Sequence, residues 1–428
     1  MSERLDPPIR YNNDVEEKKK HKKRRSHDSE EKIIKSEKTF LAFRKSDIFV
    51  TGGFDVPFFA LTISLLAIGL VMLFSASYPT SYFKYGNSYH YFIRQLIFGI
   101  VGVTVMLIVS KINYKWFKAF VPILLGVTLF LLVLVLFYHT NVATDGGEEF
   151  KRYMKIPGTG FTFQPSDIAK FTLIVTLANY MTTYAKYLKS FKYGIFFPAL
   201  VICSFCFLIF LEHHVSGTIL VFLIGLIMMY AGGSAEGNNR ILFIIGVCLV
   251  VAAIFVVLMF PDVLPDYVNR KLEAWRNKDL DPRGVRWQNN NSLYAIGSGS
   301  FLGVGLGNSK QKYLYVSEPQ NDFIFSIVCE ELGFVGAILI IVLFAALIVR
   351  GFIIALRTTD RFASLTVIGI VAQVGVQVAF NILVVTDTIP NTGIALPFFS
   401  YGGTALLMLL FEMGVVLGIS RKSNQKKV

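Results

Sequence analysis

Ten long apolar segments are the feature of this chain that most restricts what it can fold into. A helix of about 20 apolar residues is long enough to cross the hydrocarbon core of a bilayer. Of the 428 residues, 54% are hydrophobic and only 17% are charged, where a soluble domain carries about 25% charged residues. We therefore predict an all-α polytopic membrane protein with ten transmembrane helices. They lie near residues 56–77, 92–110, 118–138, 166–185, 194–212, 215–231, 241–260, 323–349, 363–385 and 403–419.

The positions of the basic residues predict which way these helices run. Cytoplasmic loops of membrane proteins carry an excess of Lys and Arg. The net charge of +13 is therefore a signal of membrane topology and not of nucleic-acid binding. We expect both termini to be cytoplasmic, in a multi-pass protein of the cytoplasmic (inner) cell membrane with no nucleic-acid partner. The connections then placed inside all carry Lys or Arg: 111–118, 186–192, 231–240, 350–361 and 421–427.

The chain is expected to divide into one membrane domain and two polar tails. Residues 1–48 are polar and strongly basic, which predicts a disordered cytoplasmic tail. Residues 49–421 would form the ten-helix domain, and 422–428 a short basic cytoplasmic tail. The loop at 261–322, between the seventh and eighth helices, is predicted to be extracellular and structured, because loops of this length are usually functional. We expect a short amphipathic helix in that loop, at 267–275.

An aspartate at the edge of an apolar run is the leading candidate for chemistry. Asp322 ends a polar, glycine-rich stretch that begins near Gln288, and the apolar run 323–349 follows directly. An ionisable group that borders a membrane span is costly, so by default it is a functional candidate. The alternative is that Asn321 or Asp322 is only the N-cap of the next helix, since helix N-termini favour such residues. The two roles can coexist.

Three glycines alternate with apolar residues in the same stretch, at Gly303, Gly305 and Gly307. As a phosphate-binding loop the signal is weak, because the full motif with its lysine and its flanking strand and helix is missing. A tight chain reversal or a close backbone contact is the better interpretation. Lys310 and Lys312 follow and would supply cations near the aspartate.

The fourth apolar segment opens with a motif of four residues. Proline, serine and an acid in the first turn are ordinary capping chemistry and predict the start of a helix. Lys170 lies one turn further on, and Arg152 lies in the preceding loop. A basic residue that faces an outer cavity suggests a phosphate or carboxylate ligand, although Lys170 could instead snorkel to the interface. The motif residues are Gln164, Pro165, Ser166 and Asp167.

The last outer connection, at 386–402, has a composition that breaks helices. Irregular backbone at membrane depth is tolerated only where protein or a water-filled cavity surrounds it, so this segment is expected to line a cavity. Gln377 and Asn381, one turn apart on the ninth span, either face that cavity or hydrogen-bond to neighbouring helices. The prolines and glycines in and beside the connection are Pro390, Gly393, Pro397, Gly402 and Gly403.

Two blocks of sequence carry a family resemblance. The first contains Gly307-Asn308-Ser309-Lys310-Gln311-Lys312-Tyr313 and Glu318-Pro319-Gln320-Asn321-Asp322, and the second is Leu396-Pro397-Phe398-Phe399-Ser400-Tyr401-Gly402-Gly403-Thr404. With them the chain resembles the SEDS family (shape, elongation, division and sporulation) from about residue 55 to 421. The stretches at 305–309 and 418–421 are more similar to its FtsW division branch than to its RodA elongation branch.

The resemblance implies a peptidoglycan glycosyltransferase that polymerises lipid II on the outer face of the membrane during cell division. Such an enzyme works with a class B penicillin-binding protein, a transpeptidase, and with other divisome proteins. The family's catalytic aspartate falls on Asp322, its Gln-Pro-Ser-acid motif on 164–167 and its loop arginine on Arg152. No organic cofactor is expected. A divalent cation, Mg²⁺ or Mn²⁺, could share the task of neutralising the diphosphate, and no metal ligands are assigned.

These considerations predict a set of roles. Asp322 is assigned as the general base that removes a proton from the acceptor sugar. The candidates for the diphosphate are Arg152, Lys170 and Lys312, since cations stabilise charge on a leaving group. The further substrate-binding candidates are Gln288, Ser292, Glu318 and Ser400.

Two other functions fit the same pattern of helices. A carrier that moves lipid II or another polyprenyl lipid across the membrane would also have many spans and an acid in a cavity, although no inverted repeat is apparent. A non-catalytic scaffold of the divisome would recruit and activate a partner enzyme. Polymer formed from purified lipid II would distinguish the enzyme from both.

Overall fold

The computed structural model of the chain describes residues 49–139, 142–143, 149–150, 153–155, 162–234, 240, 243–244, 246, 266–278 and 286–425. The described residues from Val50 onward belong to one compact unit. The basic tail at 1–48, Arg152 and most of the seventh predicted span lie outside the described residues.

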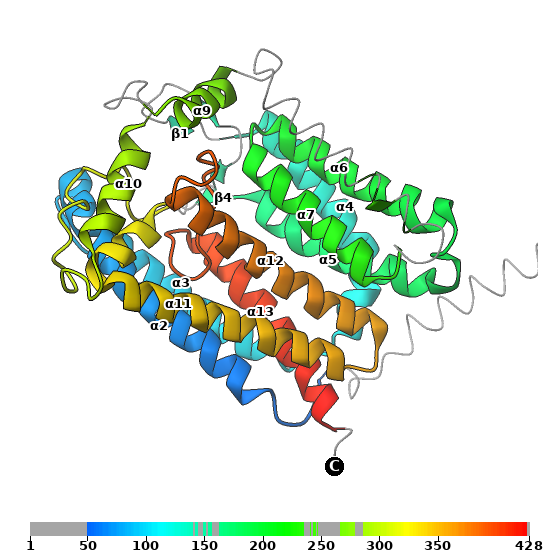
Figure 1. Cartoon of the computed structure of the whole chain (residues 1–428). Helices are drawn as coiled ribbons and strands as arrows, with labels where there is room; N and C mark the ends of the chain where they lie inside the picture. Colours follow the sequence, from blue (N-terminus) through cyan, green and yellow to red (C-terminus); the bar gives the residue numbers. More distant parts are fainter. Residues whose placement is uncertain are drawn as a thin grey trace, which may run out of the picture. The chain divides into compact units, whose positions relative to one another are not determined.

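The described part of this unit is mostly helical (Figure 1). Its α-helices are α2 (Val56–Tyr85), α3 (His90–Val109), α4 (Lys115–Phe137), α5 (Pro165–Thr183), α6 (Phe197–Leu211), α7 (Val215–Ala231), α9 (Asp266–Arg276), α10 (Trp287–Ser298), α11 (Ile324–Arg357), α12 (Arg361–Val385) and α13 (Gly403–Gln425). A 3₁₀ turn, η2 (Ala185–Tyr187), and a π turn, η3 (Lys192–Phe196), precede α6. Two short antiparallel ladders pair β1 (Val142–Ala143) with β2 (Glu149–Phe150) and β3 (Met154–Lys155) with β4 (Thr162–Phe163).

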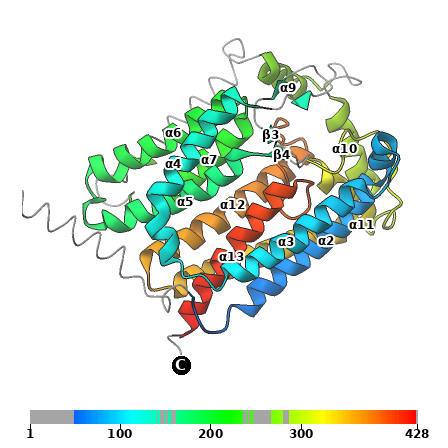
Figure 2. The same cartoon turned by 180° about the vertical axis from the view of Figure 1, so that it is seen from behind.

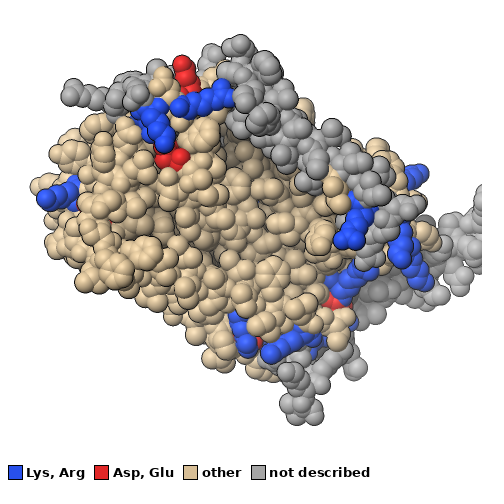
Figure 3. Space-filling model, in the orientation of Figure 1, with Lys and Arg blue, Asp and Glu red and all other residues tan. Residues whose placement is uncertain are grey.

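The helices agree with the predicted polytopic membrane protein. Within the described residues, seven helices are long and apolar enough to cross a membrane, and Val215–Ala231 is a shorter apolar helix. The face seen in Figure 3 carries Lys, Arg, Asp and Glu near its edges, and a broad middle region without them. Helices that are apolar on their outer side as well belong in lipid rather than in water. The count of ten spans remains a prediction.

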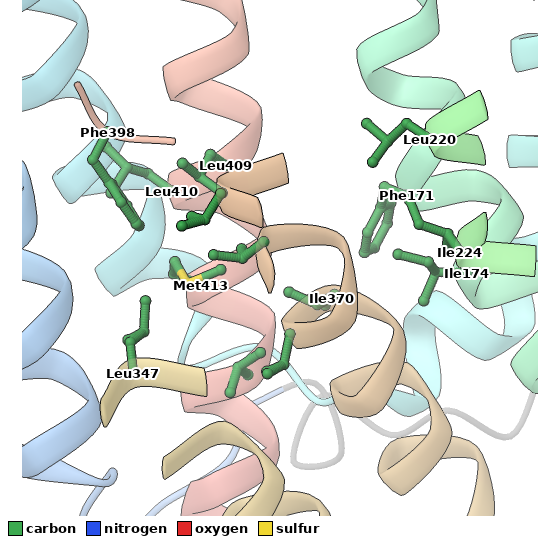
Figure 4. Close-up of a cluster of buried hydrophobic side chains, with 14 of the residues drawn as sticks. Phe171, Ile174, Leu220, Ile224, Leu347, Ile370, Phe398, Leu409, Leu410 and Met413 are labelled. Atoms are coloured by element: carbon green, nitrogen blue, oxygen red, sulfur yellow. The ribbon is translucent and has the colours of Figure 1, made fainter. Parts of the chain in front are cut away.

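The helices pack in two connected groups (Figures 1 and 2). In one group α11 contacts α2 and α12, and α13 packs along α3; in the other α4 contacts α5, and α6 pairs with α7. Contacts of α12 with α5 and α7 join the groups. Apolar side chains of α5, α7, α11, α12 and α13 fill the space between them, as in the cluster around Ile370 and Met413 (Figure 4).

Helix α11 is interrupted at Gly333, where the backbone has φ 66° and ψ −169°. The chain that follows α10 hydrogen-bonds into this break: Val304 N donates to Glu330 O at 3.0 Å, and Phe334 N donates to Ser300 O at 3.0 Å. A Cβ on Gly333 would lie 2.2 Å from the Gly303 nitrogen, so no larger residue fits. The expectation of a close backbone contact at Gly303 is confirmed, and we call Gly303 and Gly333 the glycine lock.

A partly buried ion pair lies near the other end of α11. Asp55 is the N-cap of α2, and its carboxylate accepts the Phe58 N–H at 3.0 Å. The same carboxylate receives Arg350 Nε and Nη2, each at 2.9 Å. Its own N–H donates to Ser420 Oγ at 3.0 Å. This one residue therefore ties α2, α11 and α13 together.

Candidate active site

Asp322 lies two residues before α11, at the end of the segment that runs from α10 through the glycine lock. The N-cap of α11 is Phe323, without a side-chain cap bond, so the interpretation of Asn321 or Asp322 as a helix cap is wrong. Asp322 is half-buried. Its main-chain carbonyl accepts Asn381 Nδ2 at 2.7 Å, and the same amide donates to Ile394 O at 2.8 Å. One buried side chain of α12 therefore joins the aspartate to the 386–402 connection.

Gly393 approaches the carboxylate from that connection. Its φ is +68°, a left-handed conformation that favours glycine. A Cβ built on it would lie 3.1 Å from Asp322 Oδ2, so a side chain here would crowd the carboxylate. The Gly393 N–H donates to Asn391 Oδ1 at 3.0 Å, which fixes the turn. The aspartate and the 386–402 connection, noted separately in the sequence, thus meet at one place.

Further bonds fasten this connection to the residues just before Asp322. Ser400 Oγ donates to Asn321 O at 2.8 Å, and Tyr401 N donates to Gln320 O at 2.8 Å. Gln95, buried in α3, donates to Ser400 O at 3.1 Å. The oxygen of the same amide accepts the Gly402 N–H at 3.2 Å. Ser400, expected to bind substrate, is therefore engaged in joining two segments of the chain.

Helix α10 also lies against the 386–402 connection. Gln288 Nε2 donates to Ser317 O at 2.8 Å, and Gln288 Oε1 accepts Asn391 Nδ2 at 3.4 Å. Ser292 is fully buried and donates to Val385 O at 2.9 Å. Both residues lie next to the candidate site. Each donates a hydrogen bond to a main-chain carbonyl, of Ser317 and of Val385 respectively. Their substrate-binding roles stay predictions.

Glu318 is the exposed acid of the site. It has a positive φ of 48°, and its Oε1 pairs with Lys84 Nζ at 3.1 Å. Its Oε2 accepts a hydrogen bond at 2.7 Å from Nδ2 of Asn321, the residue immediately before Asp322. The location fits a residue that could meet substrate, and that role remains a prediction.

Lys312 lies in a different environment from the one its expected role requires. Its ammonium is buried and pairs with Glu331 Oε1 at 2.9 Å. It also donates to Gly307 O at 2.7 Å and to Ser75 Oγ at 3.1 Å. A diphosphate would have to displace these partners, since an ammonium has three donors. The described contacts make Lys312 a link between the 299–323 segment, α11 and α2.

The 164–167 motif begins α5, as predicted. Gln164 is the N-cap, Pro165 is the first helical residue and Asp167 lies in the first turn. Lys170 pairs with Asp167 Oδ1 at 2.8 Å, with only 14% of its side chain exposed, so it faces the protein interior. It also interacts electrostatically with Glu412 of α13. The structure does not bring Lys170 to Asp322 through any contact described here.

The remaining motif residues shape the backbone. Pro390 and Pro397 lie in the irregular 386–402 connection, and Gly402 donates to Gln95 as described above. A Cβ on Gly403 would lie 2.3 Å from the Phe98 ring, so glycine lets α13 begin in close contact with α3. Ser166 is buried in the first turn of α5.

Sequence reasoning missed a buried ion pair beside this site. Arg286 Nη2 lies 2.9 Å from Asp387 Oδ2, and both side chains are almost fully buried. No spacing pattern could have paired two residues 101 positions apart. The available signal was an acid at the start of the 386–402 connection. Gln95 was also missed, and its signal was a polar residue inside an apolar run.

The arrangement is suited to general base chemistry. A carboxylate at the end of the bundle has its main chain held by Asn381 and its approach shaped by a glycine. Within the described residues there is no group of three or more His, Cys, Asp or Glu side chains that could hold a metal ion. Mg²⁺ commonly takes most of its ligands from phosphate and water, so binding of that cation would not require such a group.

Comparisons with known proteins agree with this fold. Residues 56–425 match the model of a cell cycle protein family that comprises FtsW, RodA and SpoVE. Stage V sporulation protein E of Bacillus subtilis (strain 168) is 38% identical over 371 residues, which cover 86% of this chain and 97% of that protein. A probable peptidoglycan glycosyltransferase FtsW of Geobacter sulfurreducens is 35% identical and covers 86% of this chain and 95% of its own length.

Solved structures show the same fold at lower sequence identity. One, described as "Structural coordination of polymerization and crosslinking by a peptidoglycan synthase complex", aligns with TM-score 0.69 at 23% identity over 87% of this chain and 99% of that one. The rod shape determining protein RodA of Thermus thermophilus aligns with TM-score 0.58 at 24% identity over 86% of this chain and 97% of its own. With the family match over almost the whole membrane domain, the chain belongs to the FtsW, RodA and SpoVE family of cell cycle proteins.

Proposed function

We propose that this protein is a peptidoglycan glycosyltransferase that polymerises lipid II, with Asp322 as the general base. The observation that carries the proposal is the meeting of Asp322 and Gly393, with a carboxylate oxygen 3.1 Å from where a Cβ would be. The two segments that make this contact, the one that ends in Asp322 and the 386–402 connection, each contain residues of the blocks that carry the family resemblance. Relatives named as probable peptidoglycan glycosyltransferases cover 86% of the chain and support the reaction class.

The reaction joins two sugars and releases a diphosphate. The 4-hydroxyl oxygen of an acceptor GlcNAc forms a bond to C1 of a donor MurNAc, and the bond from C1 to the undecaprenyl diphosphate oxygen breaks. The leaving oxygen takes the electron pair, and Asp322 takes the hydroxyl proton. General base catalysis of this kind contributes about 10²- to 10⁴-fold to a rate. A single displacement inverts the configuration at C1.

The leaving diphosphate needs positive charge. The candidates from this chain are Arg152, Lys170 and Lys312. Lys170 would first have to leave Asp167, and Lys312 would have to leave Glu331. A divalent cation such as Mg²⁺ or Mn²⁺, held mostly by the diphosphate, would neutralise the same charge. The proposal needs no organic cofactor.

The topology proposed with this function has ten spans, both termini in the cytoplasm and the active site facing outward. The end with α10 and the 386–402 connection would then be extracellular, and the end of α13, which lies at the opposite end of the bundle, cytoplasmic (Figure 1). A lipid tail of the substrate would lie between the apolar helices. The membrane would be the inner cell membrane, as for an enzyme that uses a polyprenyl-linked sugar.

The partner proposed is a class B penicillin-binding protein that cross-links the new glycan. A structural neighbour comes from a complex that couples polymerisation and crosslinking, which supports a partner of this kind. A role in cell division, together with other divisome proteins, rests on the resemblance to the FtsW branch. Depletion of the protein should then block septation before it alters the width of the cell.

The test is polymerisation of lipid II by the purified full-length protein, with and without its cognate penicillin-binding protein. Asp322→Asn should lose polymer while it expresses and binds the partner normally. Asp360→Asn is the matched control, because Asp360 caps α12 by accepting the Ala363 N–H at 3.2 Å. Translocation of lipid II without polymer would indicate a carrier. Normal division with Asp322→Asn would indicate a scaffold, and either result would overturn the proposal.

A further inference from the structure

Asp387, the second residue after α12, is held on three sides by the outer helices α9 and α10. Its Oδ2 pairs with Arg286 Nη2 at 2.9 Å, and its Oδ1 accepts Asn289 Nδ2 at 2.7 Å. Its main-chain oxygen accepts Trp275 Nε1 at 3.1 Å. The residue has φ +53°, a left-handed conformation that is uncommon for residues other than glycine, although aspartate adopts it more readily than most. Such a conformation persists where the surroundings impose it.

Arg286 is the centre of these contacts. Besides Asp387, its Nη1 donates to Ala274 O of α9 at 2.6 Å. Its Nε and Nη2 donate to Asn290 Oδ1 at 3.3 and 3.2 Å. The planar guanidinium thus ties the end of α9, the start of α10 and the start of the 386–402 connection to one another. A lysine at this position could not make the same set of hydrogen bonds, because its ammonium is a compact point charge whereas the guanidinium presents its donors in a planar fork.

Helix α10 is connected to Asp322 through a short series of contacts. Gln288 accepts Asn391 Nδ2 at 3.4 Å and donates to Ser317 O at 2.8 Å, so it joins the connection to the segment that ends in Asp322. Asn391 in turn receives the Gly393 N–H at 3.0 Å. Gly393 lies against the Asp322 carboxylate. The Arg286–Asp387 pair fixes one end of the chain segment whose other end borders the reacting group.

We infer that Arg286 and Asp387 are positioning residues that hold Gly393 in place against Asp322 and so set the orientation of the base. The inference rests on the proposed function of Asp322. Neither side chain needs to touch substrate, because both are almost fully buried, at 3% and 4% exposure. A misplacement of about 1 Å at a reacting group can cost roughly 100-fold in rate. Loosening the pair should therefore lower turnover more than it lowers substrate binding.

A cross-linking experiment measures this positioning without any activity. In the full-length protein with its four native cysteines replaced by alanine, Asp322→Cys and Gly393→Cys should form a disulfide on mild oxidation. Adding Arg286→Lys or Asp387→Asn should lower the yield of that disulfide severalfold. The two substitutions preserve size, and Arg286→Lys also preserves charge, so the protein can still fold.

The second measurement is the rate of glycan synthesis from lipid II by the single variants Arg286→Lys and Asp387→Asn. We expect kcat to fall about 10- to 100-fold, with KM for lipid II much less affected. The matched controls are Arg350→Lys and Asp55→Asn, which loosen an ion pair of the same 2.9 Å geometry at the far end of α11. These controls should keep both the disulfide yield and kcat near wild type.

The outcomes separate the two proposals. If Asp322→Asn still polymerises lipid II, the proposed function is wrong and the pair has no base to orient. If Asp322→Asn is inactive but the Arg286 and Asp387 variants behave like the controls, only the positioning role is wrong. If Arg286→Lys does not fold even in the membrane, the pair is a folding element, which also overturns the inference.

Discussion

Two aspartates at opposite ends of α11 are held in opposite ways. Asp55 is 6% exposed, and its carboxylate is bound by Arg350 and by the first turn of α2. Asp322 is half-buried, and the contacts described for it act on its main chain, through Asn381, while Gly393 borders its carboxylate. The first arrangement uses a charge to join helices. In the second, a neutral amide holds the main chain of the aspartate and a glycine lies beside its carboxylate.

The largest expected effect is on the rate of polymerisation, and it distinguishes Asp322 from Asp55. Asp322→Asn should lower polymerisation of lipid II by about 10²- to 10⁴-fold, because it removes the proposed base. Its unfolding temperature in detergent should stay close to that of wild type, since Asn381 bonds the main chain. A loss of stability as large as the one expected for Asp55→Asn would remove the contrast between the two sites.

The next effect tests the space beside the carboxylate. Gly393→Ala should lower turnover about tenfold or more, because the added Cβ would lie 3.1 Å from Asp322 Oδ2. Gly86→Ala is the matched control, since Gly86 has φ +67° against +68° and no atom within 4 Å of its Cβ position. Both variants carry the same backbone strain, of about 1–2 kcal/mol. Equal activity of the two would mean that the contact with Asp322 is irrelevant to the reaction.

The reverse pattern is expected at the other end of α11. Asp55→Asn should reduce stability by about 1–3 kcal/mol, because it weakens the bonds to a partly buried guanidinium. The folded protein that remains should polymerise lipid II at nearly the wild-type rate. Thermal unfolding in detergent and specific activity per folded molecule measure the two quantities. A large drop in specific activity would show that the two ends of α11 are coupled.

The smallest effect concerns the exposed pair near the site. Lys84 and Glu318 have side chains 43% and 49% exposed, and such pairs contribute roughly 0–1 kcal/mol. Lys84→Met should therefore leave the unfolding temperature almost unchanged. If Glu318 binds substrate as predicted, Glu318→Gln should raise KM for lipid II while Lys84→Met does not. If both substitutions change KM by the same small amount, Glu318 contributes only to the surface ion pair and does not bind substrate.

The long helices could be predicted because apolar residues fill them from end to end. Nine of the ten predicted spans coincide with helices among the described residues, and the predicted amphipathic helix coincides with α9. The ends were less accurate. Helix α2 continues to Tyr85, past a predicted end near 77, because hydropathy does not register a helix that continues with polar and aromatic residues. Helix α11 was predicted to end near 349, before the charged Arg350, but it continues through the apolar residues 351–356 to Arg357.

The candidate site could be predicted only in part. Asp322 and the 386–402 connection stand out because a charge or a broken helix is conspicuous at the edge of an apolar run. Lys312 was expected to meet a diphosphate and is instead buried against Glu331, since a sequence does not show which cations are covered. The Arg286–Asp387 pair was missed because it joins residues 101 positions apart. Hydrogen bonds between neutral groups, such as those of Asn381, are still harder to recognise in a sequence.

The break in α11 has a mechanical consequence. Hydrogen bonds from residues 304 and 305 to the carbonyls of Glu330 and Glu331 attach the first turns of α11 to the chain leaving α10. Those turns carry Asp322 at their start and change direction at Gly333. The part of α11 beyond the break is bonded to the same chain, because Phe334 N and Val335 N donate to the carbonyls of Ser300 and Phe301. A displacement of the chain that leaves α10 would therefore move both sides of the break, and with them the residues next to Asp322.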